Sequence, residues 1–186
     1  MPKIAEIEST PNPNAMKFIL RENLTWGVSC SYANADEAKD DELARRLFEI
    51  PHVSNVFYVD KWVTITQDGG ADWKELVRKV AEPIRFAAAA EAKSAAAIAE
   101  AGKTLSNLSA EDQARLDKIV ALLDEKIRPY LKSDGGDLTV VGLNGDTLSV
   151  HYQGACGSCP SSLSGTLFGI VQLLRTIEPE IVVEAV

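Results

Sequence analysis

Cysteine is scarce in this sequence, with three residues in 186. So small and odd a number argues against a secreted fold held together by disulfides. The first ten residues, MPKIAEIEST, lack the basic region and apolar run of a signal peptide, and no apolar stretch approaches the length needed to cross a bilayer. We therefore expect no membrane partner and a reducing setting, either the cytoplasm or, if a leader has been removed, the mitochondrial matrix.

Positive charge is also in short supply. Lysine and arginine together number 19 against 27 aspartate and glutamate residues, and the formal net charge is -8. Both halves of the chain are acidic, whereas a nucleic-acid-binding face needs an excess of basic groups to meet the phosphates. We expect no nucleic-acid partner. Hydrophobic residues make up 46% of the chain, a proportion typical of a globular protein, and the length suffices for two small domains.

The composition changes abruptly at Ala87. Residues 88–108 read AAAEAKSAAAIAEAGKTLSNL and are dominated by alanine, which favours helix but is too small to make a core. They divide a domain of residues 1–87 from a domain of residues 109–186. We expect an α+β protein in which two small two-layer domains are joined by this alanine-rich, partly helical linker.

Strand and helix patterns alternate in the N-terminal domain. DEAKDDELARRLFEI, beginning at Asp36, has apolar residues at helical spacing and acids in its first turns, which predicts a helix. VSNVFYVD and KWVTITQ are rich in β-branched and aromatic residues and predict a hairpin around Asp60 and Lys61. Asp72 is a suitable N-cap for a second helix, which Pro83 should kink or end.

The C-terminal domain is predicted to follow the order α-β-β-α-β. Ser109 caps a helix whose apolar stripe runs to Tyr130. Gly135 and Gly136 of SDGGD allow the turn that ends this helix. Asn144–Gly145 is a strong hairpin signal between the strands LTVVGL and DTLSVHYQ. A last helix and the closing strand IVVEAV complete a two-layer domain of ordinary size.

Two of the three cysteines, Cys156 and Cys159, lie close together in GACGSCPSSLSG. This segment follows a strand and precedes a helix that begins near Pro160, so the positive end of the helix would stabilise both thiolates. Gly154 and Gly157 let the backbone turn tightly. Both sulfurs would then face one point at an exposed edge of the domain.

This spacing alone leaves several chemistries open, because a dithiol oxidoreductase and a metal site use it equally well. A structural zinc or a [4Fe–4S] cluster needs about four protein ligands, so the pair supplies half a shell and a second copy would supply the rest. His151 is expected to point outward from its strand, and Cys30 to be a small hydrophobic residue in a distant strand. We identify no acid–base dyad and no nucleophile–base pair, and so expect no enzymatic activity.

Longer motifs favour one of these interpretations. RPYLKSDGGDLTVVGL, GACGSCPSS, TLFGIVQLL and EPEIVVEAV resemble the C-terminal domain of the Nfu, or NifU-like, iron–sulfur cluster carriers. TPNPNAMKF, ARRLFEIPHVSNVFYVDKWVTIT and ADWKELV resemble the N-terminal domain that accompanies it in many members. Two domains that resemble the family in the expected order are more specific than a pair of cysteines.

The resemblance implies a protein that binds a [4Fe–4S] cluster between two copies and transfers it to apo-proteins. The ligands would be Cys156 and Cys159 of each copy. The implied partners are a second copy in the loaded state, the apo iron–sulfur proteins that receive the cluster, and an upstream assembly scaffold that supplies it. The DGGD motif, Asp134 to Asp137, is given only a turn-forming role. A dithiol oxidoreductase and a zinc-bridged dimer are the alternatives.

Phe168 departs from the family pattern, in which polar residues are frequent at this position. Leu163, Leu167 and Ile170 occupy neighbouring helical positions, so we expect the Phe168 side chain to lie in the core. The alternative is an exposed apolar contact for a second copy or a client protein.

Overall fold

The computed structural model describes residues 3–87, 109–157 and 165–186. The chain divides into two compact units, Met1–Ser94 and Ala95–Val186. Each unit has its own sheet and its own hydrophobic core. The predicted α+β class with two small two-layer bodies is confirmed.

The domain boundaries predicted from composition stay predictions. Residues 88–108, expected to be a partly helical linker, lie outside the described residues. Among the residues that are described, no helix is both long and apolar enough to span a bilayer.

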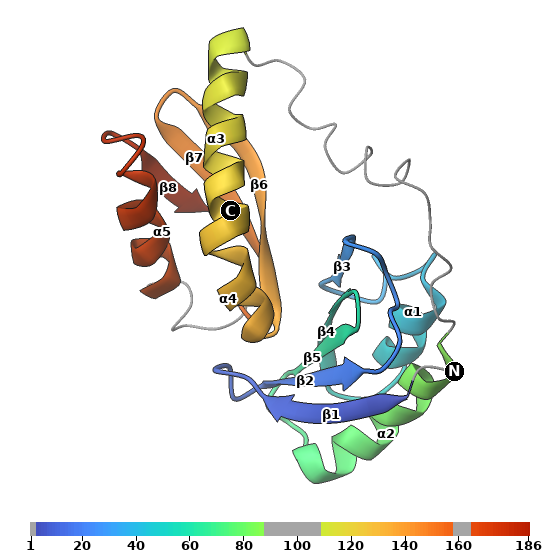
Figure 1. Cartoon of the computed structure of the whole chain (residues 1–186). Helices are drawn as coiled ribbons and strands as arrows, with labels where there is room; N and C mark the ends of the chain where they lie inside the picture. Colours follow the sequence, from blue (N-terminus) through green and yellow to red (C-terminus); the bar gives the residue numbers. More distant parts are fainter. Residues whose placement is uncertain (1–2, 88–108, 158–164) are drawn as a thin grey trace. The chain divides into compact units, whose positions relative to one another are not determined.

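The N-terminal unit combines a five-stranded sheet with two helices (Figure 1). In chain order its elements are β1 (Ile4–Ser9), β2 (Ala15–Leu20), β3 (Ser29–Tyr32), α1 (Glu42–Phe48), β4 (Val53–Val59), β5 (Trp62–Gln67) and α2 (Trp73–Phe86). The strand order is β1-β2-β5-β4-β3, and every neighbouring pair is antiparallel. The core joins strand side chains to helix side chains, among them Phe18, Val63, Ile65, Leu47, Leu76 and Val80.

The predicted hairpin is formed by β4 and β5. Val59 pairs with Trp62, which leaves Asp60 and Lys61 as a two-residue turn. Asp60 has a φ of 51°, in the left-handed region that short hairpin turns use. Its carbonyl accepts a hydrogen bond from the N–H of Leu24 at 2.6 Å, so the turn is tied to the segment before β3.

Helix α1 begins at Glu42, well after the predicted start at Asp36. The carboxylate of Asp41 accepts a hydrogen bond from the N–H of Ala44 at 2.8 Å and so caps the first turn. Upstream, the Asn34 side chain accepts from the N–H of Glu37 at 3.0 Å, a local bond that competes with helix. The acidic run therefore contains more than one residue that can cap a helix, and the predicted start at Asp36 is wrong.

Helix α2 is capped as predicted, because the Asp72 carboxylate accepts from the N–H of Lys74 at 2.8 Å. Pro83 does not end it, and the helix continues to Phe86. A proline near the end of a helix removes one backbone donor. Burial of the following residue, Ile84, in the core holds the last turn in place.

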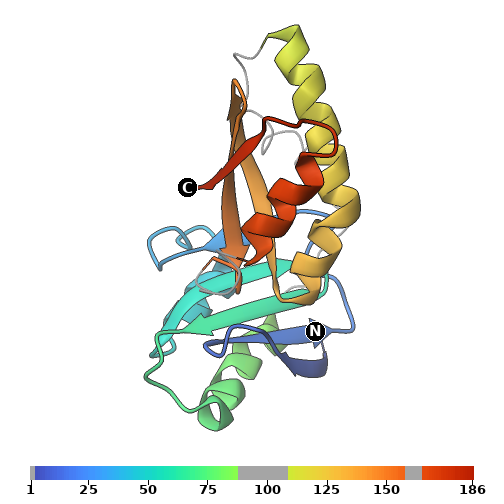
Figure 2. The same cartoon turned by 90° about the vertical axis from the view of Figure 1, so that its left-hand side faces the viewer.

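The C-terminal unit is a three-stranded sheet with its helices packed on one face (Figure 2). Its elements are α3 (Ala110–Lys126), α4 (Arg128–Ser133), β6 (Gly136–Asn144), β7 (Thr147–Gly154), α5 (Leu167–Leu174) and β8 (Val182–Ala185). β6 and β7 are antiparallel, whereas β7 and β8 are parallel. The predicted order is confirmed, with the first helix divided in two.

The division of that helix falls at Ile127, whereas a single helix was predicted to continue to the SDGGD turn. α4 starts at Arg128 and has Pro129 in its first turn, where the missing N–H of proline costs nothing. The new helix buries Leu131 and leaves Tyr130 73% exposed. The predicted apolar stripe was therefore wrong at Tyr130.

The turn between β6 and β7 lies slightly later than predicted. Asn144 pairs with Thr147, so Gly145 and Asp146 form the turn, and Gly145 has a φ of 58°. The Arg115 guanidinium donates to the carbonyl of Gly145 at 3.2 Å and to the carboxylate of Asp146 at 2.9 Å. These bonds fix the turn to α3.

Candidate iron–sulfur site

Cys156 lies in a tight turn that directly follows β7. The N–H of Ala155 donates to the carbonyl of Gly135 at 3.1 Å, and the N–H of Gly157 donates to the carbonyl of Gly154 at 3.2 Å. Gly154 has a φ of 64°, which glycine adopts without strain. The turn therefore brings Cys156 back against the start of β6.

The Cys156 thiol faces inward. It is 2% exposed and belongs to the core cluster that contains Leu138 and Tyr152. The prediction of an exposed edge is therefore wrong for this thiol. Cys159 and Pro160 lie outside the described residues, so the convergence of the two sulfurs stays a prediction.

Gly136 of the DGGD motif makes this approach possible. A Cβ atom on Gly136 would lie 2.6 Å from Sγ of Cys156 and 2.6 Å from the carbonyl oxygen of Gln153. No side chain fits at such distances. Gly135, with a φ of 83°, forms the predicted turn, while Gly136 provides the seat for the sulfur. Sequence reasoning explained both glycines by the turn and missed the second role.

Asp137, the last residue of the motif, is a buried carboxylate. It accepts a hydrogen bond from the N–H of Leu138 at 2.8 Å, and Nη1 of Arg128 lies 3.4 Å from each of its oxygens. Burial raises the pKa of the Asp137 carboxyl above its ordinary value, and Arg128 offsets part of that rise. Nε of Arg128 also lies 2.5 Å from Oδ1 of Asp124. Arg128 therefore links α3 and α4 to β6, the strand against which Cys156 packs.

Tyr152 places a hydroxyl in the same core. It pairs with Leu138 across β6 and β7 and is 5% exposed. Its hydroxyl oxygen is buried and has no hydrogen-bond partner within the described residues. Burial, with a smaller contribution from Cys156, raises the pKa of Tyr152 to about 12. Tyr152 alternates along β7 with the outward-pointing His151, which accounts for its inward direction, but the sequence gives no reason to assign its hydroxyl a role.

The other candidate ligands lie in different surroundings. His151 points outward as predicted, and its Nδ1 lies 2.7 Å from the carbonyl oxygen of Val186. Cys30 is half-buried against the core of the N-terminal unit. In the part of the chain that the structure describes, no group of three or more His, Cys, Asp or Glu side chains could hold a metal ion. Of the predicted cysteine ligands, Cys156 is the one whose position is known.

Phe168 is 66% exposed, so its predicted place in the core is wrong. Ile170 and Leu174 are fully buried and define the inner face of α5. A helix turns by about 100° per residue, so a residue two positions before Ile170 points away from that face. The neighbouring leucines in the sequence did not reveal this register.

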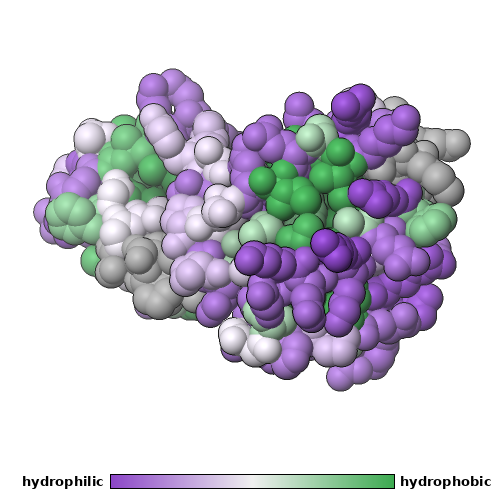
Figure 3. All heavy atoms as spheres, turned by 90° about the horizontal axis from the view of Figure 1, so that it is seen from below, coloured by the Kyte–Doolittle hydropathy of each residue, from purple (hydrophilic) through white to green (hydrophobic). Residues whose placement is uncertain are grey.

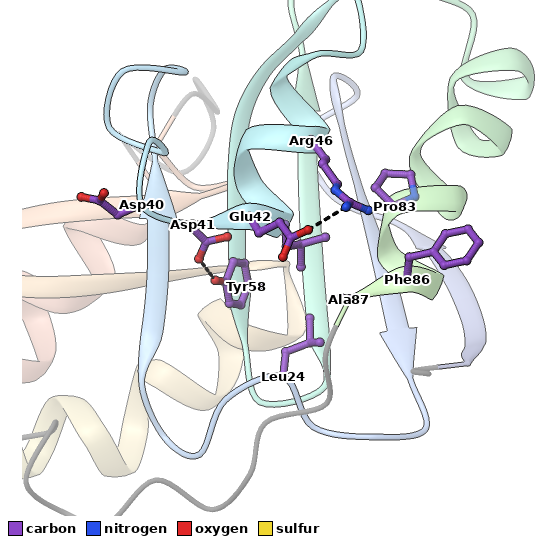
Figure 4. A pocket seen from close by; sticks show the side chains of 10 residues that line it. Leu24, Asp40, Asp41, Glu42, Arg46, Tyr58, Pro83, Phe86 and Ala87 are labelled. Carbon is purple, nitrogen blue, oxygen red and sulfur yellow. Dashed lines mark hydrogen bonds and ion pairs between the residues drawn. The ribbon is translucent and has the colours of Figure 1, made fainter.

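The N-terminal unit has a cavity of about 220 Å³ beside α1 and the end of α2 (Figure 4). The hydroxyls of Tyr58 and Tyr32 both donate to the carboxylate of Asp41, the latter at 3.0 Å. Burial and the bond to Asp41 raise the pKa of Tyr58 well above its ordinary value. Glu42 forms an ion pair with Arg46 at 2.6 Å. The polar residues that line the cavity are therefore already bonded to other side chains, and these bonds hold the start of α1 in place.

A groove of about 550 Å³ runs between β1 and α2. Ile4 and Ile7 line it from the strand, and Val77 and Ala81 line it from the helix. Figure 3 shows apolar side chains gathered on this side of the unit with hydrophilic ones around them. The lining of the groove, among the residues that the structure describes, includes no cysteine or histidine, in contrast to the surroundings of β7.

Comparison with known proteins places the whole chain in one family. The model of the Nfu/NifU scaffold protein N-terminal domain matches residues 4–90, and that of the NifU-like domain matches residues 119–184. The chain is 30% identical over 178 residues to the human protein "NFU1 iron-sulfur cluster scaffold homolog, mitochondrial", covering 95% of this chain and 68% of the human protein. It is 29% identical over 180 residues to the protein of the same name in Drosophila erecta.

The coverage is unequal among these relatives. The match to the Drosophila erecta protein includes 95% of this chain but 62% of the fly protein, so the chain spans less than two thirds of that relative. A solution structure of a NifU-like protein from Saccharomyces cerevisiae is 28% identical, with a TM-score of 0.41, and covers 44% of this chain and 74% of the yeast chain. On the two domain matches and the similarity to the human protein, the chain belongs to the Nfu/NifU-like family of iron–sulfur cluster scaffold proteins.

Proposed function

We propose that this chain carries a [4Fe–4S] cluster, bound through Cys156 and Cys159, and transfers it to apo-proteins. Family membership supports cluster binding. The observation that carries the proposal is the seat of the Cys156 sulfur against Gly136, because it joins the two motifs of the C-terminal domain at one point. The role is that of a scaffold or carrier, not of an enzyme.

The number of sulfurs supports a cluster shared between two copies. A [4Fe–4S] cluster takes about four thiolate ligands, and the C-terminal domain has only Cys156 and Cys159. His151 is held at the Val186 carbonyl, and Cys30 belongs to the other unit. Two copies related by a twofold axis would supply the four sulfurs.

Transfer would proceed by exchange of ligands. A thiolate of the receiving protein binds an iron atom as one carrier cysteine leaves it, so each exchange replaces one iron–sulfur bond by another and needs no oxidant. Cys156 is buried in the described structure, so its turn would open only at the moment of transfer, when the receiving thiolate displaces its sulfur. The glycines at Gly154 and Gly157 allow that change with little backbone strain. The N-terminal unit would recognise the receiving protein, and an upstream scaffold would supply the cluster.

Anaerobic reconstitution with iron and sulfide tests this proposal. The wild-type chain should turn brown, hold about four iron atoms per two chains, and have the mass of two chains when loaded. Cys156→Ala should abolish the chromophore. Cys30→Ala is the matched control and should load like the wild type, since Cys30 lies in the N-terminal unit. A full cluster in Cys156→Ala, or in a single chain without added thiol, would contradict the proposal.

The same samples distinguish the two alternatives. Zinc in place of iron in the two-chain species would identify a structural zinc bridge. A metal-free single chain that forms a reversible disulfide between Cys156 and Cys159 and reduces a test disulfide would identify an oxidoreductase. Either result would replace the cluster carrier as the function.

A further inference from the structure

The hydroxyl of Tyr152 is the least satisfied polar group in the neighbourhood of Cys156. It is buried and, within the described residues, bonds to no donor or acceptor. Leaving a hydroxyl in this state costs stability, because it gives up hydrogen bonds to water without replacement. Phenylalanine would fill the same space at no such cost, so the unbonded hydroxyl calls for an explanation.

The register of the sheet places this side chain beside the sulfur. Gly136 and Leu138 are two residues apart on β6 and therefore face the same side of the sheet, and Leu138 pairs with Tyr152. Sγ of Cys156 occupies the inward position at Gly136. Tyr152 and the sulfur thus lie in adjacent rows of one face, a diagonal separation that aromatic side chains can reach across. Both belong to the same core cluster.

We infer that Tyr152 is a positioning residue whose hydroxyl donates a hydrogen bond to the Cys156 sulfur when that sulfur is a metal-bound thiolate. A thiol is a weak acceptor, whereas a thiolate is a strong one, so the bond forms only in the loaded state. This inference rests on the proposed ligand role of Cys156.

The surroundings of Tyr152 suit a donor. A phenolic hydroxyl keeps its proton at physiological pH and can therefore donate a hydrogen bond. Hydrogen bonds from outside the coordination shell orient ligands and tune the metal centre. In the unloaded chain the same group brings only the cost of its burial. The hydroxyl thereby favours the loaded over the unloaded protein.

Tyr152→Phe tests this with three measurements, one on the unloaded chain and two on the loaded chain. The unloaded variant should melt at the wild-type temperature or a few degrees higher, because an unsatisfied hydroxyl is removed. The loaded variant should lose its cluster to an iron chelator about tenfold faster than the wild type, the expected effect of losing one charge-assisted hydrogen bond. Its reduction potential should also fall, since a donor to the cluster ligands has gone.

Tyr130→Phe is the matched control, because Tyr130 lies in the same unit and is largely exposed. It should change none of the three quantities. If Tyr152→Phe lowers the melting temperature of the unloaded chain and leaves cluster loss unchanged, the hydroxyl is structural and the inference is wrong. Equal behaviour of Tyr152→Phe and the wild type would also overturn it. Failure of the wild type to load at all would instead sink the proposed function.

Discussion

The sulfur of Cys156 occupies the space that a Cβ atom on Gly136 would need, with 2.6 Å between the two positions. The two residues come from motifs that are separate in sequence, Gly136 from DGGD and Cys156 from GACGSC. Their contact means that the position of the thiol depends on the identity of residue 136. The contact also explains on steric grounds why residue 136 is a glycine, which turn chemistry does not explain.

Gly136→Ala should therefore disturb the site. The new methyl group must displace Cys156 or the backbone at Gln153, and overpacking of this kind costs about 1–3 kcal/mol. We expect a lower free energy of unfolding of the C-terminal unit in urea and less cluster per chain after reconstitution. Gly142→Ala is the control on the same strand, since no atom lies within 4 Å of the added Cβ there. Equal effects of the two substitutions would show that the contact has no consequence.

Asp137 should make the free energy of unfolding of the C-terminal unit depend on pH. Its pKa is higher in the folded than in the unfolded chain, chiefly because it is buried, so the folded state binds its proton more tightly. The contribution of Asp137 to the free energy of unfolding should then decrease as pH rises from the ordinary carboxyl pKa through the raised one.

The measurement is the difference between wild type and Asp137→Asn in urea unfolding at a series of pH values. The wild-type free energy should fall relative to that of the variant as pH rises from about 4, since asparagine does not titrate. Asp134→Asn, an exposed change in the same motif, should follow the wild type. If the wild type instead gains stability relative to Asp137→Asn as pH rises, Arg128 has a larger effect on the pKa of Asp137 than burial has.

Substitution of Phe168 should have little effect on stability and substitution of Ile170 a large one, although the two residues are close in sequence. Phe168→Ser should change the stability of the unloaded chain by less than about 0.5 kcal/mol, whereas Ile170→Ala should cost about 2–5 kcal/mol. If the exposed ring contacts a second copy, Phe168→Ser should also weaken the loaded two-chain species in sedimentation experiments. An unchanged dimer, with slower transfer to a receiving protein, would assign the ring to the client instead.

Asp41 should contribute strongly to the stability of the N-terminal unit. Its carboxylate caps α1 and accepts the hydroxyls of Tyr32 and Tyr58. Asp41→Ala should lower the free energy of unfolding by about 2–4 kcal/mol, from loss of the cap and of two hydrogen bonds. Tyr32→Phe should cost less, since it removes one bond and leaves the cap. Thermal unfolding monitored by tyrosine absorbance checks this, and a loss no greater than that of Tyr32→Phe would contradict it.

Much of the architecture could be predicted from the chain because local signals agree with the tertiary structure. The hairpin at Asp60–Lys61 and the caps at Asp72 and Ser109 are examples. The failures occur where local signals compete. Several acids could cap α1, and the chain selects Asp41 because two tyrosines also bind it. Tyr130 fits the periodicity of α3, but Pro129 starts a new helix with a different inner face.

The site was predictable only in part, for a physical reason. The spacing of Cys156 and Cys159 indicates two ligands, but the residues that surround a ligand come from other elements. The pairing of β6 with β7 brings Gly136 against Cys156 and places Tyr152 in the same core cluster, and a linear pattern does not contain that pairing. Neither a glycine nor a tyrosine carries a signal of such a role by itself.

The parallel pairing of β7 with β8 has a consequence for evolution at this site. Parallel neighbours require the chain to return along the sheet between them, and the cysteine segment with α5 makes that return. Both ends of the segment are thus anchored on one small body. Extra residues would add only slowly to the entropy of closing the connection. Insertions between β7 and α5 should therefore be tolerated in evolution while the pairing of the three strands is kept.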